Sequence, residues 1–184
     1  MAPGAPFFSS CEIALSNSGM SLVVMGVAGC GKSSLGRTLA AAQGLALIEG
    51  DDFHSAENKA RMAGGIALTD ADREDWLAAL AAELVRHPQG AVLTCSALKL
   101  RYRELLRHAR PGLLFAFLSI TRSEAQARVD ARKPHFFAAS LVETQFATLE
   151  DPSGEAGVLV LDASLPVEQL SRQVSTWLQT RTAA

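Results

Sequence analysis

The sequence predicts a three-layer α/β domain built around a parallel sheet. Five short apolar runs of strand length recur along the chain, and segments of helical period separate them. Several of these runs are continuously apolar, as expected of strands that a parallel sheet buries on both faces. Ligands of such domains bind at the carboxyl ends of the strands, so we expect the functional residues in the turns that follow the runs.

The expected strands are SLVVM, LALIE, AVLTC, LLFAFLS and VLVLD, at residues 21–25, 45–49, 91–95, 113–119 and 158–162. The helical patterns cover residues 33–43, 69–86, 98–108, 123–131, 139–149 and 167–180. Gly44 follows the first pattern and suits a C-terminal cap. The second opens with Thr69 and Asp72 in capping-box spacing. Each element therefore has a local signal as well as a period.

Length and composition favour a single domain with small partners. The chain has 184 residues, of which 48% are hydrophobic and 20% charged, enough for one sizeable core. A formal charge of −2 gives no global reason to bind nucleic acid or an anionic membrane. No apolar run approaches the ~20 residues of a membrane helix, and the three cysteines suit a reducing compartment. We therefore expect a cytoplasmic protein that binds neither nucleic acid nor membrane.

The first twenty residues differ from the rest of the chain. Pro, Gly and Ser are mixed there with scattered apolar residues, and neither strand nor helix period is present. We therefore expect residues 1–20 to be a disordered extension and residues 21–184 to form the domain. Met20 directly precedes the first strand, so Met1 and Met20 both remain open as the physiological start.

A glycine-rich segment follows the first expected strand. GVAGCGKS, at residues 26–33, fits the pattern G-x-x-x-x-G-K-[ST] in full and stands between an apolar strand and a helix. In such loops backbone N–H groups face phosphate oxygens, the lysine reaches the β- and γ-phosphates, and the hydroxyl residue ligates Mg²⁺. The residues assigned to the nucleotide are Gly26, Gly29, Cys30, Gly31, Lys32 and Ser33. Cys30 is interpreted as a small filler, with a redox role as the alternative.

Two carboxylates stand at the end of the second strand. The third strand ends without a Walker-B aspartate, so the carboxylate near Mg²⁺ must come from another segment. Glu49 and Asp51 would point the same way if the extended geometry persisted, with Glu49 toward Mg²⁺ and Asp51 toward the acceptor as general base. The alternative is an acidic loop that caps the next helix. His54, a lone histidine, either orients this loop or contacts substrate.

Three longer segments carry a resemblance to a known family. GDDFHSAENKARMAGGIALTDADREDWL, CSALKLRYRELLR and ARKPHFFAASLVETQFATLEDP resemble the gluconokinase family of P-loop kinases, over about residues 22–162. The resemblance implies phosphorylation of D-gluconate by ATP with Mg²⁺. It also implies the nucleoside-monophosphate-kinase-like fold, with a five-stranded parallel sheet, a substrate-binding helical segment after the second strand and a mobile lid. The resemblance further implies a soluble and often dimeric enzyme, while the sequence itself leaves open whether this chain forms a homodimer.

The resemblance also implies roles for individual residues. Ser34 joins Gly29, Gly31, Lys32 and Ser33 in the ATP loop, and Asp51 takes the acceptor-hydroxyl position. Gluconate carries a carboxylate, which a cation must bind, best an arginine in bidentate geometry. The candidates for substrate binding are Asp51, His54, Arg61, Arg73, Lys99, Arg103 and His135. The alternative for each of these arginines and for Lys99 is a solvated place on a helix surface.

A basic segment marks the expected lid, at about residues 128–138. Arg128 and Arg132 share a helical face, and lids of this fold place arginines over the γ-phosphate in the transition state. A solvated basic run is the alternative. Pro134 stands where the family usually has glycine, and its fixed φ puts the hinge motion of the lid in doubt.

Three functions compete at this point. The first is a gluconate kinase, and the second is a kinase for another small acceptor, such as shikimate or a nucleoside monophosphate. The third is a non-catalytic nucleotide-binding regulator. Asp51 beside a complete phosphate loop argues against the third, because a pure binder needs no carboxylate that activates a hydroxyl. The gluconokinase-like segments argue against the second.

Overall fold

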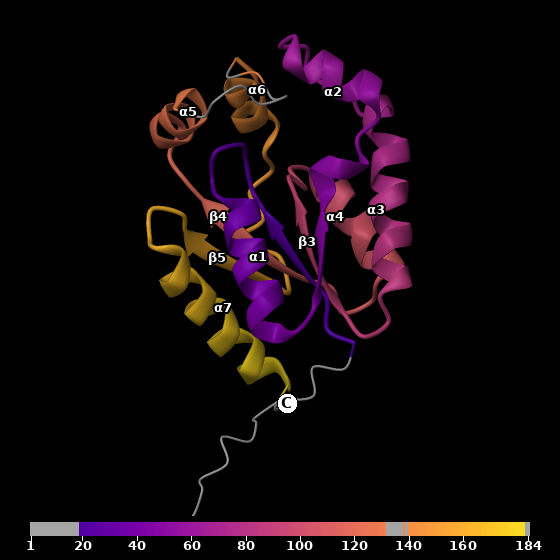
Figure 1. The fold of residues 1–184 in the computed structure, drawn as a ribbon, viewed down its shortest axis with the longest axis vertical. Coiled ribbons are helices and arrows are strands. Elements are labelled where there is room, and N and C mark those ends of the chain that lie inside the picture. Colours follow the sequence, from indigo (N-terminus) through magenta and orange to yellow (C-terminus); the bar gives the residue numbers. More distant parts are fainter. Residues whose placement is uncertain (1–18, 132–137, 139, 183–184) are drawn as a thin grey trace, which may run out of the picture.

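The computed structural model describes residues 19–131, 138 and 140–182. Its centre is a parallel sheet of five strands in the order β2-β3-β1-β4-β5 (Figure 1). The strands are β1 (Leu22–Met25), β2 (Ala46–Glu49), β3 (Ala91–Cys95), β4 (Leu114–Ser119) and β5 (Val158–Asp162). The α/β class, the parallel sheet and its five strands are therefore confirmed.

Helices cover both faces of this sheet (Figure 1). α1 (Lys32–Gln43) packs beside α7 (Val167–Thr182), and α3 (Glu74–Arg86) packs beside α4 (Leu100–Ala109) on the other side. Val24 and Leu35 belong to the core under α1 and α7, whereas Val23 and Leu80 belong to the core under α3 and α4. Successive residues of β1 thus enter opposite cores, which explains why this strand is apolar throughout.

Three short helices lie beyond the carboxyl ends of the strands (Figure 1). They are α2 (Ala56–Ala63), α5 (Arg122–Asp130) and α6 (Leu141–Thr148). Met62, Leu68 and Leu141 form a small separate core, and the Ala138 N–H donates to the Met62 carbonyl oxygen at 3.2 Å. α2 and α6 therefore meet across the top of the sheet, although 77 residues, which include α3, α4 and α5, separate the end of α2 from the start of α6.

The segment before α3 differs from the helix expected from Thr69 onward. A 3₁₀ turn, η2 (Ala71–Arg73), comes first, and α3 begins at Glu74. The expected reciprocal contacts are present: the Thr69 N–H donates to Asp72 Oδ2 at 2.7 Å, and the Asp72 N–H donates to Thr69 Oγ1 at 3.2 Å. The capping box therefore closes one turn ahead of the α-helix.

The helical periods did not mark α2, which the resemblance alone implied. Only Met62 of its eight residues is buried, so the helix has almost no apolar face to reveal it. Ser55 supplies its N-terminal cap by accepting a hydrogen bond from the Asn58 N–H at 3.1 Å.

Gly19 and Met20, which precede the expected boundary at residue 21, already contact the domain. Gly19 donates its N–H to the Gln89 carbonyl at 3.3 Å, and its own carbonyl accepts from Arg110 Nη2 at 2.6 Å. Met20 packs against the core under α1 and α7. Residues 1–18 of the expected extension lie outside the described residues. In the described part of the chain no helix has the length and apolarity needed to cross a membrane.

Candidate active site

The phosphate-binding loop joins β1 to α1. Gly29 and Gly31 adopt φ of 82° and 102°, a region that favours glycine, and a Cβ on Gly29 would lie 2.7 Å from the Ala125 carbonyl oxygen. Lys32 Nζ donates to the carbonyl oxygens of Gly26 and Val27 at 3.1 and 3.0 Å, so its ammonium group lies inside the loop. The N-terminus of α1 and this lysine together make the loop a binding site for anionic groups.

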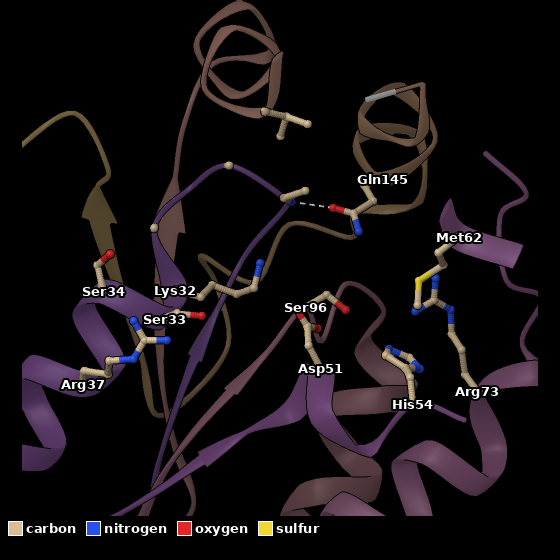
Figure 2. A pocket seen from close by; sticks show the side chains of 14 residues that line it. Lys32, Ser33, Ser34, Arg37, Asp51, His54, Met62, Arg73, Ser96 and Gln145 are labelled. Carbon is tan, nitrogen blue, oxygen red and sulfur yellow. Dashed lines mark hydrogen bonds between the residues drawn. The ribbon is translucent and has the colours of Figure 1, made fainter. Parts of the chain in front are cut away.

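A pocket of about 340 Å³ opens at this loop (Figure 2). It is lined by Ala28, Gly29, Gly31, Lys32, Ser33, Ser34, Arg37, Asp51, His54, Met62, Arg73, Ser96, Val129 and Gln145. The pocket thus brings the predicted nucleotide residues together with three predicted acceptor residues, Asp51, His54 and Arg73. Of the predicted loop residues, Gly26 and Cys30 do not line it, and the Cys30 side chain is buried behind the loop.

A second pocket of about 280 Å³ adjoins the first, since Met62, Arg73 and Gln145 line both. Lys99 lies in this second pocket, where its Nζ contacts both carboxylate oxygens of Asp70 at 2.9 Å. Arg101 and the Tyr102 hydroxyl also bind Asp70. Lys99 therefore lies close to the first pocket, but its ammonium group already forms an ion pair with Asp70.

Glu49 connects the loop to the sheet. Its Oε2 accepts hydrogen bonds from Ser33 Oγ at 2.9 Å and from Thr94 Oγ1 at 2.6 Å, and its Oε1 lies 3.1 Å from Arg37 Nη2. The described residues contain no group of three or more His, Cys, Asp or Glu that could enclose a metal. Mg²⁺ in nucleotide sites is held by one or two protein oxygens together with phosphates and waters, so the Ser33 and Glu49 oxygens fit that ion.

The extended geometry from which a shared direction of Glu49 and Asp51 was expected does not persist beyond Glu49. β2 ends at Glu49, and a 3₁₀ turn, η1 (Gly50–Phe53), begins at the next residue. A Cβ on Gly50 would lie 2.3 Å from the Thr94 carbonyl oxygen, so only glycine lets the chain turn this close to β3. The turn leaves Glu49 on Ser33 and places Asp51 in the pocket.

His54 forms part of the acceptor wall. Its ring stacks on Trp76, with the centroids 4.4 Å apart and the planes 10° from parallel, and Trp76 Nε1 donates to the Gly50 carbonyl at 2.7 Å. Only 6% of His54 is exposed. Burial, joined by the charges of Arg73 and Lys59 and opposed by Asp51, lowers the pKa of His54 from 6.5 to about 4. The imidazole is therefore neutral at physiological pH, and among the described residues its Nδ1 has no hydrogen-bond partner.

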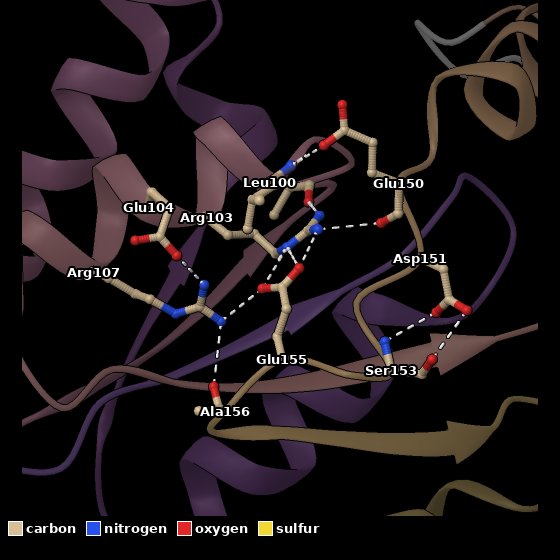
Figure 3. Close-up of polar contacts among 10 residues, drawn as sticks. Leu100, Arg103, Glu104, Arg107, Glu150, Asp151, Ser153, Glu155 and Ala156 are labelled. Atoms are coloured by element: carbon tan, nitrogen blue, oxygen red, sulfur yellow. Dashed lines mark hydrogen bonds and ion pairs between the residues drawn. The ribbon is translucent and has the colours of Figure 1, made fainter.

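Arg103 does not lie where the sequence suggested. Its side chain is fully buried and its guanidinium binds Glu155, the Ala97 carbonyl oxygen at 2.8 Å and the Glu150 carbonyl oxygen at 3.2 Å (Figure 3). It lines neither pocket. The prediction of a substrate-binding Arg103 is corrected accordingly, because this side chain ties the start of α4 to the segment after α6.

The carboxyl group of Glu155 responds to this environment. Burial raises its pKa, but hydrogen bonds and charge from Arg103 and Arg107 outweigh burial and hold the pKa below its usual range. Arg107 Nη2 lies 2.8 Å from Glu155 Oε2. Glu155 is therefore an anion between two arginines, as expected of an ion pair that fixes local structure.

Arg61 and Arg128, the other predicted arginines that the structure describes, also lie outside the walls of these two pockets. Arg61 Nη1 lies 2.6 Å from Asp72 Oδ1 and lines neither pocket. Arg128 Nη2 donates to the Ala163 carbonyl oxygen at 2.9 Å, whereas its neighbour Val129 lines the first pocket. Arg132 and His135, with Pro134 and most of the expected lid, lie outside the described residues.

Several residues of the pocket were not identified from the sequence. Gln145 on α6 lines both pockets, and its Oε1 accepts a hydrogen bond from the Ala28 N–H at 2.6 Å. Its place in the segment LVETQF, which is part of the family resemblance, was a usable signal. Ser96 lines the first pocket next to Ala97, which has a φ of 45°. Such strain in a non-glycine residue clusters at functional sites but leaves no trace in the sequence.

Comparisons with known proteins agree on a small-molecule kinase. The sequence profile of the shikimate kinase family matches residues 28–150. The chain is 41% identical to the thermoresistant gluconokinase of Escherichia coli (strain K12) over 150 residues, 79% of this chain and 86% of that protein. It is 43% identical to the gluconokinase of Gluconobacter oxydans (strain 621H) over 141 residues, 75% of this chain and 79% of that protein.

Solved structures of small-molecule kinases are also similar to this chain. The crystal structure of a gluconokinase from Sinorhizobium meliloti 1021 superposes with a TM-score of 0.77 at 45% identity and covers 84% of this chain and 88% of its own. A shikimate kinase from Acinetobacter baumannii reaches a TM-score of 0.61 at 13% identity and covers 88% and 94%. The second likeness shows the fold alone.

Proposed function

The chain belongs to the gluconokinase family, and from this membership we propose that it transfers the γ-phosphoryl group of ATP to D-gluconate and releases ADP and 6-phospho-D-gluconate. The observation that carries the proposal is one pocket in which the phosphate loop and Asp51 lie together. The shikimate kinase profile reflects the shared fold, because identity to the three gluconokinases described above is 41–45%, whereas identity to the shikimate kinase is only 13%.

The phosphate loop binds the triphosphate of ATP in this proposal. Backbone N–H groups of residues 29–34 and the Lys32 ammonium group face its oxygens. Lys32 now bonds two carbonyl oxygens of its own loop, so phosphate binding exchanges those contacts for charged ones. Ser33 and Glu49 would hold Mg²⁺, which neutralises charge on the phosphates when bound.

Asp51 acts as the general base. The primary hydroxyl oxygen of gluconate forms the new bond to the γ-phosphorus, and the bond from that phosphorus to the β–γ bridging oxygen breaks, leaving its electron pair on ADP. The hydroxyl proton passes to the Asp51 carboxylate. Asp51 suits this role because it is exposed inside the pocket on the turn after β2, next to the loop.

Three other side chains bind the sugar acid. The neutral His54 ring offers Nδ1, a buried atom without a partner in the described part of the chain, to a substrate hydroxyl. Arg73 lines both pockets and is the cation best placed for the gluconate carboxylate. Lys99 lies further along the second pocket and supports the same charge while bound to Asp70. Arg132 and His135 remain proposals from the resemblance.

An ADP-release assay tests this function against its alternatives. Purified protein is supplied with ATP and Mg²⁺ and with gluconate, the gluconate epimers, shikimate or AMP, and the product is identified by phosphorus NMR. We expect gluconate to exceed each competitor by about 10² or more in kcat/KM. Preferred turnover of shikimate or AMP would overturn the substrate, and ATP binding without turnover of any acceptor would favour the regulator.

A further inference from the structure

Gln145 connects the phosphate loop to the acceptor side of the pocket. It is carried by α6, whereas Ala28 lies in the loop 117 residues earlier, and the distance from the Ala28 nitrogen to Gln145 Oε1 is 2.6 Å (Figure 2). The same side chain lines the first pocket and the second. No other contact described in the pocket joins the loop directly to α6.

The chemistry of this contact fixes the orientation of the carboxamide. A backbone N–H can only donate, so the amide oxygen of Gln145 must face Ala28. Rotating the amide by half a turn would set its NH₂ against the loop N–H and lose this hydrogen bond. The Ala28 N–H therefore fixes the position of Gln145 Oε1, and the planar amide fixes the direction of Nε2 as well.

The amide nitrogen consequently faces away from the loop. In Figure 2 the Gln145 nitrogen is turned toward the side of the pocket where Ser96 lies, while its oxygen meets Ala28. Asp51 and His54 line this same pocket. The NH₂ group has two donors, and a polyol carries several hydroxyl oxygens that accept hydrogen bonds.

Resting on the proposed function, we infer that Gln145 is a specificity-determining residue that donates from Nε2 to one hydroxyl oxygen of the sugar acid, with its own position set by the Ala28 N–H of the phosphate loop. The loop then aligns the acceptor as well as the phosphates. His54, offered from the opposite side of the pocket, accepts from or donates to a different hydroxyl. Two neutral groups thereby bind the uncharged part of the substrate, and the cations remain for the carboxylate.

The binding of gluconate analogues distinguishes a hydrogen bond from Gln145 to substrate from a purely structural role of this residue. Gluconate and its monodeoxy analogues, including 6-deoxygluconate, are titrated into the ADP complex by calorimetry, with wild-type protein and with Gln145→Met. Methionine is similar in length to glutamine but has no donor. We expect the variant to bind gluconate about tenfold more weakly, the value of one neutral hydrogen bond. For the analogue that lacks the contacted hydroxyl, the variant and the wild type should agree within about twofold.

Uniform loss across all analogues would show that Gln145 only holds α6 against the loop, and unchanged gluconate affinity would show that it has no role. Gln145→Asn keeps the carboxamide but shortens its reach, so it provides a second variant if the methionine form folds poorly. Gln173→Met, at an exposed site of α7, is the matched control and should bind every analogue as the wild type does. Wild-type turnover of gluconate is measured first, so that failure of the proposed function is seen separately from failure of this inference.

Discussion

Ser33 and Glu49 are hydrogen-bonded to each other, with Ser33 Oγ 2.9 Å from Glu49 Oε2. The contact joins the first turn of α1 to the end of β2, and Thr94 Oγ1 on β3 reaches the same carboxylate oxygen at 2.6 Å. No Walker-B aspartate is needed for this arrangement, because a carboxylate from β2 stands beside the serine of the phosphate loop instead.

The first prediction concerns this carboxylate. Glu49→Gln retains the shape and one acceptor but removes the charge, so we expect a higher Mg²⁺ concentration for half-maximal rate and partial recovery of activity in excess Mg²⁺. Initial rates over a Mg²⁺ titration measure this, and calorimetric titration of Mg²⁺ into the ADP complex provides a readout independent of turnover. An unchanged Mg²⁺ dependence in both measurements would remove Glu49 from the metal site.

The second prediction concerns the base. Asp51→Asn cannot accept the hydroxyl proton, and general-base catalysis contributes about 10² to 10⁴ in rate, so kcat should fall within that range while ATP affinity persists. Asp52→Asn is the matched control, since Asp52 is also exposed on η1 but lines neither described pocket around the loop. If Asp51→Asn kept kcat within about threefold of wild type, the carboxylate would be no more than part of a loop.

The third prediction follows from the buried histidine. The pKa of His54 is about 4 in the folded protein and 6.5 in the unfolded chain, so between these values the unfolded state binds more protons. Its contribution to stability is present above pH 6.5 and is lost as pH falls toward 4. At pH 5 the loss relative to neutral pH should be about 2 kcal/mol, since each pKa unit is worth about 1.4 kcal/mol.

Denaturant unfolding at pH 7 and pH 5 measures that loss. His54→Phe preserves a ring for the stack on Trp76 and should flatten the pH dependence by the same amount. His108→Gln, at an exposed histidine of α4, should leave the dependence as in the wild type. An equal pH dependence in wild type and His54→Phe would contradict a neutral buried His54.

The phosphate loop could be predicted from the sequence because its chemistry is local. Its glycines, Lys32 and Ser33 are consecutive, and a strand and a helix flank them, so the pattern contains nearly everything that shapes the loop. The five short apolar runs likewise predicted the five strands. These features depend on neighbours in the chain rather than on the tertiary fold.

The other site residues depend on contacts that spacing does not reveal. Glu49 bonds Ser33 and Asp51 lines the pocket on a 3₁₀ turn that begins at Gly50, where the chain passes close to the Thr94 carbonyl of another strand. Gln145 enters the site through a contact with a residue 117 positions away. The type of a residue limits which interactions its side chain can make. Its partners in the tertiary structure decide whether that side chain binds substrate or stabilises the fold.

Arg103 has a structural role although its position in the sequence suggested substrate binding, and the last prediction concerns this residue. On the helix pattern it stood beside Lys99 and Tyr102 as a cation for substrate, yet its partners are Glu155 and the carbonyl oxygens of Ala97 and Glu150. Arg103→Met removes the buried donor from those carbonyl oxygens and one of the two arginines from Glu155, which keeps Arg107. Because breaking a buried ion pair by removing one partner costs about 3 to 5 kcal/mol and Arg107 still compensates the charge, we expect a loss at the lower end, about 3 kcal/mol, in the free energy of unfolding.

The KM for gluconate separates this scaffold role from a role in binding. Arg103→Met should keep the KM within about threefold of wild type at a temperature where the variant is folded, whereas loss of a charged contact to the gluconate carboxylate would raise it by tenfold or more. Arg86→Met is the matched control: Arg86 is 70% exposed in its pair with Glu83, and surface pairs contribute about 0 to 1 kcal/mol. A large rise in KM with little loss of stability would return Arg103 to the substrate site, and would require Glu155 to release it when gluconate binds.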